Sequence, residues 1–331
     1  MSTVVPVELA DAALAADVTD GLALVEEGLR QAAKSHYDLL DETAAHLIEA
    51  GGKRFRATLT LLAAQFGNPR DPRVIQAAVA LELTHVATLY HDDVMDEAEV
   101  RRGSPSANAR WDNSVAILTG DFLFACASTI LAELGPDAVK IQADTFRRLV
   151  VGQIAETVGP RSGQDPLEHY MGVVTEKTSS LIATSGLFGA MFAGAPDGVT
   201  ARIAPACAAL GVAFQLSDDI LDVASETDQS GKTPGTDLRE GVPTLPVLHA
   251  LRSAGAGDAR LVELLTNSDL TDQTARSETL ALLREHPGMQ MARADLRHWA
   301  DQARREILAL PEVPARAAFE TMCDFVIERS G

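Results

Sequence analysis

The chain has 331 residues and a formal net charge of −19, which argues against a nucleic-acid partner because such a partner requires a basic face. Hydrophobic residues make up 46% of it and aromatic residues 5%, and the apolar residues recur at helical spacing, so an all-α globular fold is expected. The three cysteines are widely spaced, which argues against a disulfide framework or a cysteine zinc site and favours a reducing, cytoplasmic location.

The sequence predicts neither a secretory signal nor a membrane span. The N-terminal region is acidic and lacks the cationic segment of a signal peptide. The longest uncharged run, Thr178–Pro196, contains five Ser or Thr and three Gly residues and follows Lys177. This composition favours a buried core helix over a helix that crosses a membrane.

In chain order, residues 1–17 are predicted to be a flexible leader and residues 18–331 a single domain, because no repeat or linker interrupts them. Apolar periodicity predicts helices over the following ranges: 18–35, 39–50, 59–66, 72 to the aspartate-rich stretch, 115–134, 137–158, 167–193 and 199–224. Residues 100–113 and 225–246 are rich in turn formers and are predicted to be loops, and a loop of the second length is usually functional. The remaining residues are predicted to be helical, with breaks near Ser268 and at Pro287, Pro311 and Pro314.

A basic segment follows the predicted second helix. Gly51 and Gly52 are typical of a helix end, and Lys53, Arg54 and Arg56 come directly after them. Free backbone N–H groups and three cations beside a helix start suit an anion. Taken alone, a capped helix followed by solvated basic residues would explain the same pattern.

An acidic cluster lies near the end of the next predicted helix. Asp92 and Asp96 are four residues apart and therefore point the same way, with Asp93 beside them. Their repulsion weakens a helix unless a cation binds, and a set of carboxylate oxygens suits Mg²⁺. A solvated acidic helix face is the alternative for a single motif of this kind.

The same spacing recurs in Asp218, Asp219 and Asp222 on another predicted helix, with Gln215 on the same face. Two such motifs are far more specific than one, because facing helices build metal sites from inward-pointing carboxylates. Two carboxylate sets acting on one phosphate substrate indicate several Mg²⁺ ions that clamp a polyanion.

Four segments together carry a family resemblance: GGKRFRA (Gly51–Ala57), HDDVMDEAEVRRG (His91–Gly103), FQLSDDILD (Phe214–Asp222) and GKTPGTDLREGVPTLP (Gly231–Pro246). In this order they resemble the trans-isoprenyl diphosphate synthases, or polyprenyl synthetases, of the long-chain bacterial type, over nearly the whole chain. The resemblance implies a single-domain bundle of antiparallel helices around a central active-site cavity, usually a homodimer. It also implies three Mg²⁺ ions per site when substrate is bound.

The resemblance implies a role for each matching residue. Six aspartates are implied metal ligands: Asp92, Asp93, Asp96, Asp218, Asp219 and Asp222. Nine residues are implied to contact the diphosphate groups of isopentenyl diphosphate or the allylic substrate: Gly52, Lys53, Arg56, His85, Arg101, Arg102, Lys177, Lys232 and Arg239. Three are implied to be catalytic: Lys177, Thr178 and Gln215. Of these, Thr178 and Gln215 offer neutral oxygens that can stabilise an allylic cation.

One position departs from the family pattern. Val242 stands where the family often has a second lysine, which puts one diphosphate contact in doubt and makes Arg239 its candidate substitute. The reaction implied by the resemblance is Mg²⁺-assisted ionisation of the allylic C1–O bond, followed by condensation with isopentenyl diphosphate. The departing diphosphate is implied to take the final proton.

Product length is expected to follow the depth of an apolar tunnel beneath the first aspartate motif. The residues before Asp92 on that face are all small: Ala80, Thr84, Ala87 and Thr88. Phe124 and Leu131 are candidates for the tunnel floor by helical position. Short-chain members of the family tend to carry bulky aromatic residues four and five positions before the motif, so a product longer than farnesyl is expected, from hexaprenyl to decaprenyl. It could serve as a quinone side-chain precursor, and a geranylgeranyl diphosphate synthase is the alternative.

Three other classes of protein remain open from the sequence. A terpene cyclase also ionises a diphosphate with an aspartate-rich helix, but has no use for the GGKRFRA segment. A regulatory helical subunit of a heteromeric prenyl synthase is expected to have lost aspartate or basic positions, which are intact here. A helical protein that merely binds a divalent cation does not explain Lys53, Arg56, Lys177 and Lys232.

Overall fold

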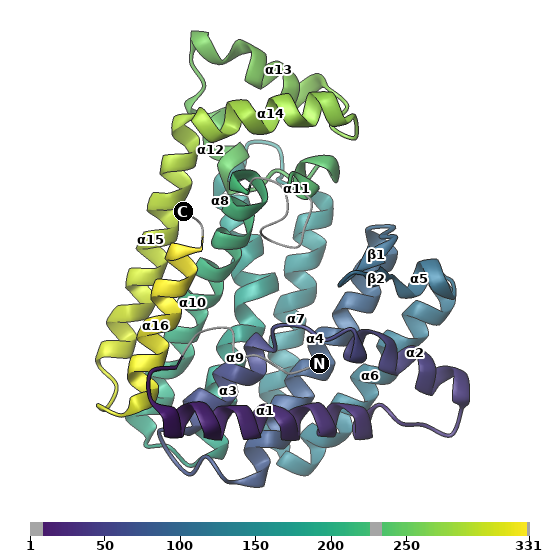
Figure 1. Ribbon diagram of the computed structural model, residues 1–331, viewed down its shortest axis with the longest axis vertical. Coiled ribbons are helices and arrows are strands. Elements are labelled where there is room, and N and C mark those ends of the chain that lie inside the picture. Colours follow the sequence, from purple (N-terminus) through teal and green to yellow (C-terminus); the bar gives the residue numbers. More distant parts are fainter. Residues whose placement is uncertain (1–8, 226–233, 330–331) are drawn as a thin grey trace. The chain divides into compact units, whose positions relative to one another are not determined.

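The computed structural model of the protein describes residues 9–225 and 234–329, and most of these residues are helical (Figure 1). The only strands in these ranges are two-residue strands, β1 (Val100–Arg101) and β2 (Ser104–Pro105). The prediction of an all-α fold is therefore confirmed.

The chain divides into two compact units, and every boundary between them falls inside a helix. Unit 1 comprises Met1–Arg147, Leu181–Cys207 and Glu306–Thr321, and unit 2 comprises Arg148–Ser180, Ala208–Arg305 and Met322–Gly331. The single domain expected over residues 18–331 stays a prediction, and the two units are described separately.

Unit 1 is built around α4. Its helices are α1 (Ala12–Ala32), α2 (Asp38–Glu49), α3 (Phe55–Ala64), α4 (Pro72–Met95), α5 (Ala107–Arg110), α6 (Asn113–Leu134), the start of α7 (Pro136–Val158), α9 (Ser180–Phe192) beyond its first residue, the start of α10 (Asp197–Ala224), the end of α15 (Pro287–Leu308) and the start of α16 (Pro314–Glu328). In α4 the buried residues lie on all faces, as expected of a helix at the centre of a core, and the helix packs mainly against α6. The start of α4 follows from its sequence, since Asp71 caps the backbone N–H of Arg73 and Pro72 occupies the first turn.

Unit 2 contains the remaining parts of those helices together with shorter ones. These are α8 (Pro166–Val173), the π-helix η1 (Val174–Ser179), α11 (Thr236–Arg239), α12 (Leu245–Ser253), the 3₁₀-helix η2 (Ala256–Asp258), α13 (Ala259–Asn267) and α14 (Gln273–Glu285). The helix predicted over residues 167–193 is therefore three successive segments with a π-helical turn in the middle. The loop predicted over residues 225–246 contains α11.

The N-terminal prediction needs a correction. Helix α1 begins at Ala12 because the Asp11 side chain caps the N–H of Leu14, and Leu14 and Val18 are buried. The flexible leader predicted through residue 17 is therefore wrong for residues 12–17, while residues 1–8 lie outside the described part of the chain. In Figure 1, α1 runs crosswise to α4 and packs against both α3 and α4.

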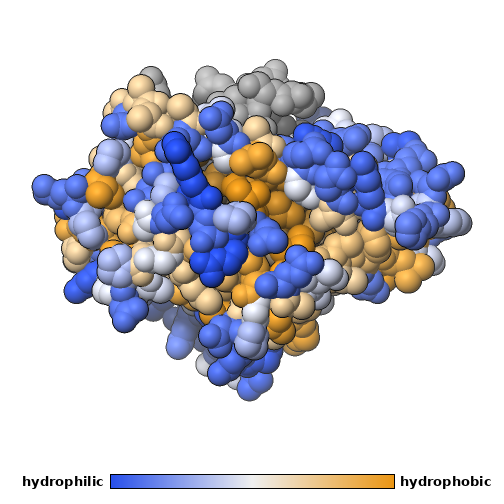
Figure 2. Space-filling view, turned by 90° about the horizontal axis from the view of Figure 1, so that it is seen from below, coloured by the Kyte–Doolittle hydropathy of each residue, from blue (hydrophilic) through white to orange (hydrophobic). Residues whose placement is uncertain are grey.

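Apolar side chains are also exposed on the surface. On α6, Ile117 and Leu118 are 42% and 64% exposed, and Figure 2 shows hydrophobic residues exposed among hydrophilic ones on the face that it presents. Two described helices, α6 and α10, are long and apolar enough to cross a membrane. The core helices of a protein that crosses no membrane can have the same length and composition. The expectation that the chain spans no membrane stays a prediction.

A close approach between α3 and α9 provides a test of the packing in unit 1. A Cβ atom on Gly189 would lie 2.1 Å from the backbone oxygen of Thr60 and 2.9 Å from Ala63 Cβ. We expect Gly189→Ala to lower the free energy of unfolding by about 1–3 kcal/mol, because backbone has to move to make room. Thermal or denaturant unfolding measures this change.

The matched control is Gly172→Ala on α8, where an added Cβ meets no atom within 4 Å. Its effect is expected to stay within about 1 kcal/mol and to be stabilising if anything, since alanine favours a helix. Equal destabilisation by both variants would contradict the close packing of α3 on α9.

Candidate active site

The basic segment between α2 and α3 adopts a backbone that favours glycine. Gly51, Gly52 and Arg54 have φ angles of +81°, +152° and +44°. At Gly52 an added Cβ would lie 3.0 Å from the Arg102 guanidinium, so the missing side chain lets that guanidinium lie against the segment. Lys53 is exposed at the turn.

Two buried residues, Arg54 and Glu82, hold this segment in place. The sequence predicts neither of these structural roles. Arg54 is buried, and it pairs with Glu26 (Nε–Oε1 2.6 Å) and donates to the Ile48 carbonyl at 2.9 Å. Glu82 on α4 is also buried, accepts from the Ala57 N–H at 3.0 Å and lies 3.7 Å from Arg54. An acidic residue on a buried helix face requires a partner, and this was the signal that could have identified Glu82.

Positive charge gathers around His85 on α4. Burial is the main reason why the pKa of His85 lies well below its usual value, and the charges of Arg56, Arg102, Arg54 and Arg101 lower it further. The imidazole is therefore neutral. Burial lowers the pKa of Arg56, and burial together with the neighbouring Arg54 lowers that of Arg102 to about 10, so both guanidiniums stay charged near neutral pH.

This group, the basic cluster, consists of Arg54, Arg56, His85, Arg101 and Arg102. The positive charges of its arginines repel one another, and the negative charge of the buried Glu82 partly compensates for them. An anion that binds here is attracted by several guanidiniums, which suit phosphate oxygens because they donate two hydrogen bonds at once.

A tight hairpin carries the two arginines that follow the first aspartate motif. Strands β1 and β2 pair with Arg101 opposite Ser104, and the turn residues Arg102 and Gly103 have φ angles of +54° and +75°. Positive φ at both positions is typical of a two-residue type I′ turn. Arg102 also donates to the Leu47 carbonyl at 2.7 Å, which ties the hairpin to the end of α2.

The three carboxylates of the first motif have different surroundings. Asp93 is completely buried and accepts from Arg101 Nε at 2.5 Å, whereas its Oδ2 has no hydrogen-bond partner among the described residues. Burial raises the pKa of Asp93, and Arg101 opposes that rise. Asp92 is half-buried, and Asp96, at the end of α4, is exposed and 4.0 Å from Arg101.

The second motif on α10 repeats this arrangement in unit 2. Its middle residue, Asp219, is buried and accepts hydrogen bonds from the Tyr170 hydroxyl and from Gln215 Nε2 at 2.9 Å. Burial raises the pKa of Asp219 to about 7 despite these two donors. The sequence reading missed Tyr170, and nothing in its local pattern identifies it.

The outer aspartates of the second motif are only half-buried and contact other parts of unit 2. Asp218 pairs with Arg329 at 2.9 Å, a C-terminal residue that the sequence reading also missed. Asp222 accepts from the backbone N–H groups of Thr236 and Asp237 at 3.1 and 3.2 Å and so anchors the start of α11.

The π-helical turn η1 carries the two predicted residues Lys177 and Thr178. Such turns occur frequently at functional sites. Lys177 pairs with Glu156, and a Cβ on Gly152 would lie 2.5 Å from the Lys177 backbone nitrogen, so α7 approaches η1 closely. Thr178 donates to Gln215 Oε1 at 3.2 Å, and Gln215 in turn donates to Asp219, so two of the three predicted catalytic residues are linked to the second motif.

Of the two predicted substrate contacts in the loop after α10, the structure describes only Arg239. Arg239, at the end of α11, is exposed and pairs with Glu240 at 3.3 Å. Val242 is 37% exposed. Lys232 lies outside the described residues, so its role stays a prediction.

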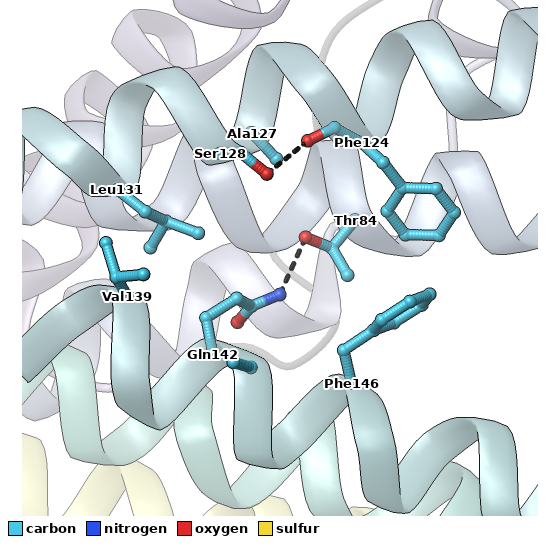
Figure 3. A pocket seen from close by; sticks show the side chains of 9 residues that line it. Thr84, Phe124, Ala127, Ser128, Leu131, Val139, Gln142 and Phe146 are labelled. Carbon is cyan, nitrogen blue, oxygen red and sulfur yellow. Dashed lines mark hydrogen bonds between the residues drawn. The ribbon is translucent and has the colours of Figure 1, made fainter.

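A cavity of about 250 Å³ lies between α4, α6 and the unit 1 part of α7 (Figure 3). It is lined mainly by apolar side chains: Thr84, Phe124, Ala127, Ser128, Leu131, Val139, Gln142, Ala143 and Phe146.

Three of the predicted tunnel residues, Thr84, Phe124 and Leu131, line this cavity. Ala80 and Ala87 are buried but are not among its lining residues. Thr88 is half-buried and donates to the His85 carbonyl at 2.7 Å, so it does not line the cavity either.

The chemistry of the aspartate motifs fits Mg²⁺. Within residues 9–225 and 234–329, no three His, Cys, Asp or Glu side chains converge into a ready-made metal cage. Mg²⁺ typically takes only one or two carboxylates and completes its shell with water and substrate phosphates. The buried Asp93 Oδ2 without a hydrogen bond and the accessible outer aspartates are donors of the required type.

Comparisons with known proteins point to one family. The family described as polyprenyl synthetase matches residues 37–283. The nonaprenyl diphosphate synthase of Mycobacterium tuberculosis (strain ATCC 25618 / H37Rv) is 49% identical over 331 residues, which is 100% of this chain and 98% of that protein.

Two crystal structures have the same fold. A geranylgeranyl pyrophosphate synthase from Corynebacterium glutamicum, complexed with calcium and isoprenyl diphosphate, gives a TM-score of 0.88 at 47% identity, over 98% of this chain and 100% of that one. A decaprenyl diphosphate synthase from Rhodobacter capsulatus gives 0.85 at 31% identity, over 96% of this chain and 99% of that one.

The raised pKa of Asp219 predicts how stability depends on pH. Between the usual aspartate pKa near 4 and the folded value of about 7, the folded state holds a proton that the unfolded state has lost. The contribution of Asp219 to the free energy of unfolding is therefore fully present below pH 4 and falls by a few kcal/mol as the pH rises to 7. Denaturant unfolding at a series of pH values measures it.

The comparison variant is Asp219→Asn, which is nearly the same size and carries no titrating proton. We expect the difference in stability between the unchanged protein and this variant to shift in favour of the variant from pH 4 to pH 7. A difference that stays constant over this range would show that Asp219 titrates normally.

Proposed function

Since the chain belongs to the polyprenyl synthetase family, whose members are trans-prenyltransferases, we propose that it condenses isopentenyl diphosphate with an allylic diphosphate. The product is an all-trans polyprenyl diphosphate longer than farnesyl, in the hexaprenyl to decaprenyl range. A quinone side-chain precursor is the corresponding biological use.

One observation carries this proposal. In both aspartate motifs the middle carboxylate is buried and hydrogen-bonded, whereas the two outer carboxylates, four residues apart, are half-buried or exposed. A site that holds several Mg²⁺ ions on a diphosphate requires more than one set of accessible carboxylates, and the chain has two. We propose three Mg²⁺ ions per site when substrate is bound.

When bound, Mg²⁺ neutralises the leaving diphosphate and so favours ionisation of the allylic C1–O bond. The basic cluster is proposed to hold the diphosphate of isopentenyl diphosphate, together with Gly52 and Lys53. Neutral His85 can donate a hydrogen bond to a phosphate oxygen without adding to the repulsion among the arginines. Arg101 is proposed to contact the allylic diphosphate while it holds Asp93.

Lys177, Thr178 and Gln215 are proposed to act near the reacting carbon. The Thr178 hydroxyl and the Gln215 amide oxygen offer neutral dipoles that stabilise a cation without trapping it. Tyr170 and Asp219 act as positioning residues in this proposal, because Gln215 Nε2 donates to the carboxylate that Tyr170 also holds.

The cavity below the first motif supports a long product. Its apolar lining and volume of about 250 Å³ provide room for a hydrocarbon tail, and Phe124 and Phe146 line it without filling it. Geranylgeranyl diphosphate remains the second candidate product, since the Corynebacterium glutamicum structure is named for that product.

A second copy of the chain is proposed to cover α6. Only 33% of the most apolar 18-residue window of α6 is buried within the chain, and Ile117 and Leu118 are exposed on it. A homodimer in the cytoplasm is the arrangement that we propose. The oligomeric state in solution, measured by light scattering, tests it.

Turnover by the purified protein alone tests the function. With farnesyl and isopentenyl diphosphates and Mg²⁺, linear products longer than geranylgeranyl are expected in mass analysis. Turnover without another protein removes the regulatory-subunit alternative, a cyclic hydrocarbon would favour a terpene cyclase, and a sole product of geranylgeranyl length or shorter would contradict the proposed length.

Ala127→Phe tests whether the growing chain occupies the cavity. Ala127 is buried and lines it, so a phenyl group at this position fills space that the tail would use. We expect the main product to become shorter by at least one isoprene unit, as read by mass analysis. Ala132→Phe, at an exposed position on the same helix, is the control and should leave the product unchanged; equal shortening by both would contradict the assignment.

A further inference from the structure

A polar bridge crosses the otherwise apolar cavity. Gln142 on α7 donates from Nε2 to the Thr84 hydroxyl on α4 at 2.8 Å, and Thr84 in turn donates to the Ala80 carbonyl at 2.8 Å. Both side chains are nearly inaccessible, at 7% and 1% exposure. Figure 3 shows the bridge between Phe124 and Phe146 on one side and Leu131 and Val139 on the other.

The amide of Gln142 is only half satisfied. Its Oε1 is buried and has no hydrogen-bond partner among the described residues. A buried carbonyl without a partner is unfavourable, and a hydrocarbon in contact with it offers no hydrogen bond. A purely structural brace between two helices would gain nothing from leaving this oxygen unpaired.

The bridge also lies at a definite depth. Thr84 is two helical turns before Asp92 on α4, or about 12 Å along the axis at 1.5 Å per residue. If the chain end that carries the diphosphate is held at the aspartates, a tail that grows along α4 meets the bridge after a few isoprene units.

We propose that Gln142 sets the share of short products, because its amide, held on Thr84, is a polar barrier that a hydrocarbon tail must pass before it can grow to the hexaprenyl length. This inference rests on the proposed function and adds a residue to it. To pass, the tail has to displace the amide from Thr84 or lie against its unpaired oxygen. Either event favours release of the product over addition of the next unit.

The test compares variants that separate polarity from bulk. Gln142→Leu and Gln142→Met remove the amide and keep most of the volume, whereas Gln142→Ala removes both. With farnesyl and isopentenyl diphosphates and Mg²⁺, the molar ratio of products with six or more isoprene units to products with four or five units should rise about tenfold in the Leu and Met variants. Thermal unfolding identifies any variant that does not fold, and the methionine variant is the more adaptable of the two.

Thr129→Ala is the matched control, since Thr129 also donates to a carbonyl of its own helix, that of Ala125, but does not line the cavity. Its product distribution should equal that of the unchanged protein. An unaltered distribution in folded Leu and Met variants would overturn the inference, and so would lengthening in Gln142→Ala alone, which would show that space and not polarity sets the length. Absence of any elongation by the unchanged protein would overturn the proposed function and this inference with it.

Discussion

The repulsion between closely spaced carboxylates is the constraint on which the site depends. Three aspartates within five positions of one helix repel one another, and this repulsion destabilises the helix. The chain resolves this in the same way twice, since the middle carboxylate is buried against its own donors, Arg101 for Asp93 and Tyr170 with Gln215 for Asp219. The outer carboxylates are half-buried or exposed, so a cation can reach them.

The second constraint in unit 1 is the excess positive charge of the basic cluster. Four arginines lie close enough to His85 to lower its pKa, and the buried Glu82 and half-buried Glu26 oppose only part of their charge. The glycines before α3 and the type I′ turn after α4 bring these residues together. A cluster with excess positive charge and accessible carboxylates beyond it suits a metal-bound diphosphate, in a chain whose net charge of −19 would otherwise repel an anion.

The motifs were readable from sequence because their chemistry depends on spacing along one helix. Apolar periodicity predicted the long helices, and Pro72 predicted the start of α4. Tyr170, Arg329, Glu82 and Gln142 could not be assigned a role in this way, since each acts through a partner far away in the chain. The start of α1 was missed because a single cap, Asp11, outweighs the weak apolar pattern that follows it. The π-helical turn at Lys177 has no signature in local composition.

The proposed function requires carboxylates of both aspartate motifs for Mg²⁺-dependent binding of a diphosphate. A double-mutant cycle with Asp96→Asn and Asp218→Asn tests it, with the Mg²⁺-dependent affinity for a non-reactive allylic diphosphate analogue as the measured quantity. The double variant is expected to lose much less affinity than the sum of the two single losses, because either change alone already removes Mg²⁺ that the diphosphate needs. Strictly additive losses, as expected of two independent cation sites, would contradict it.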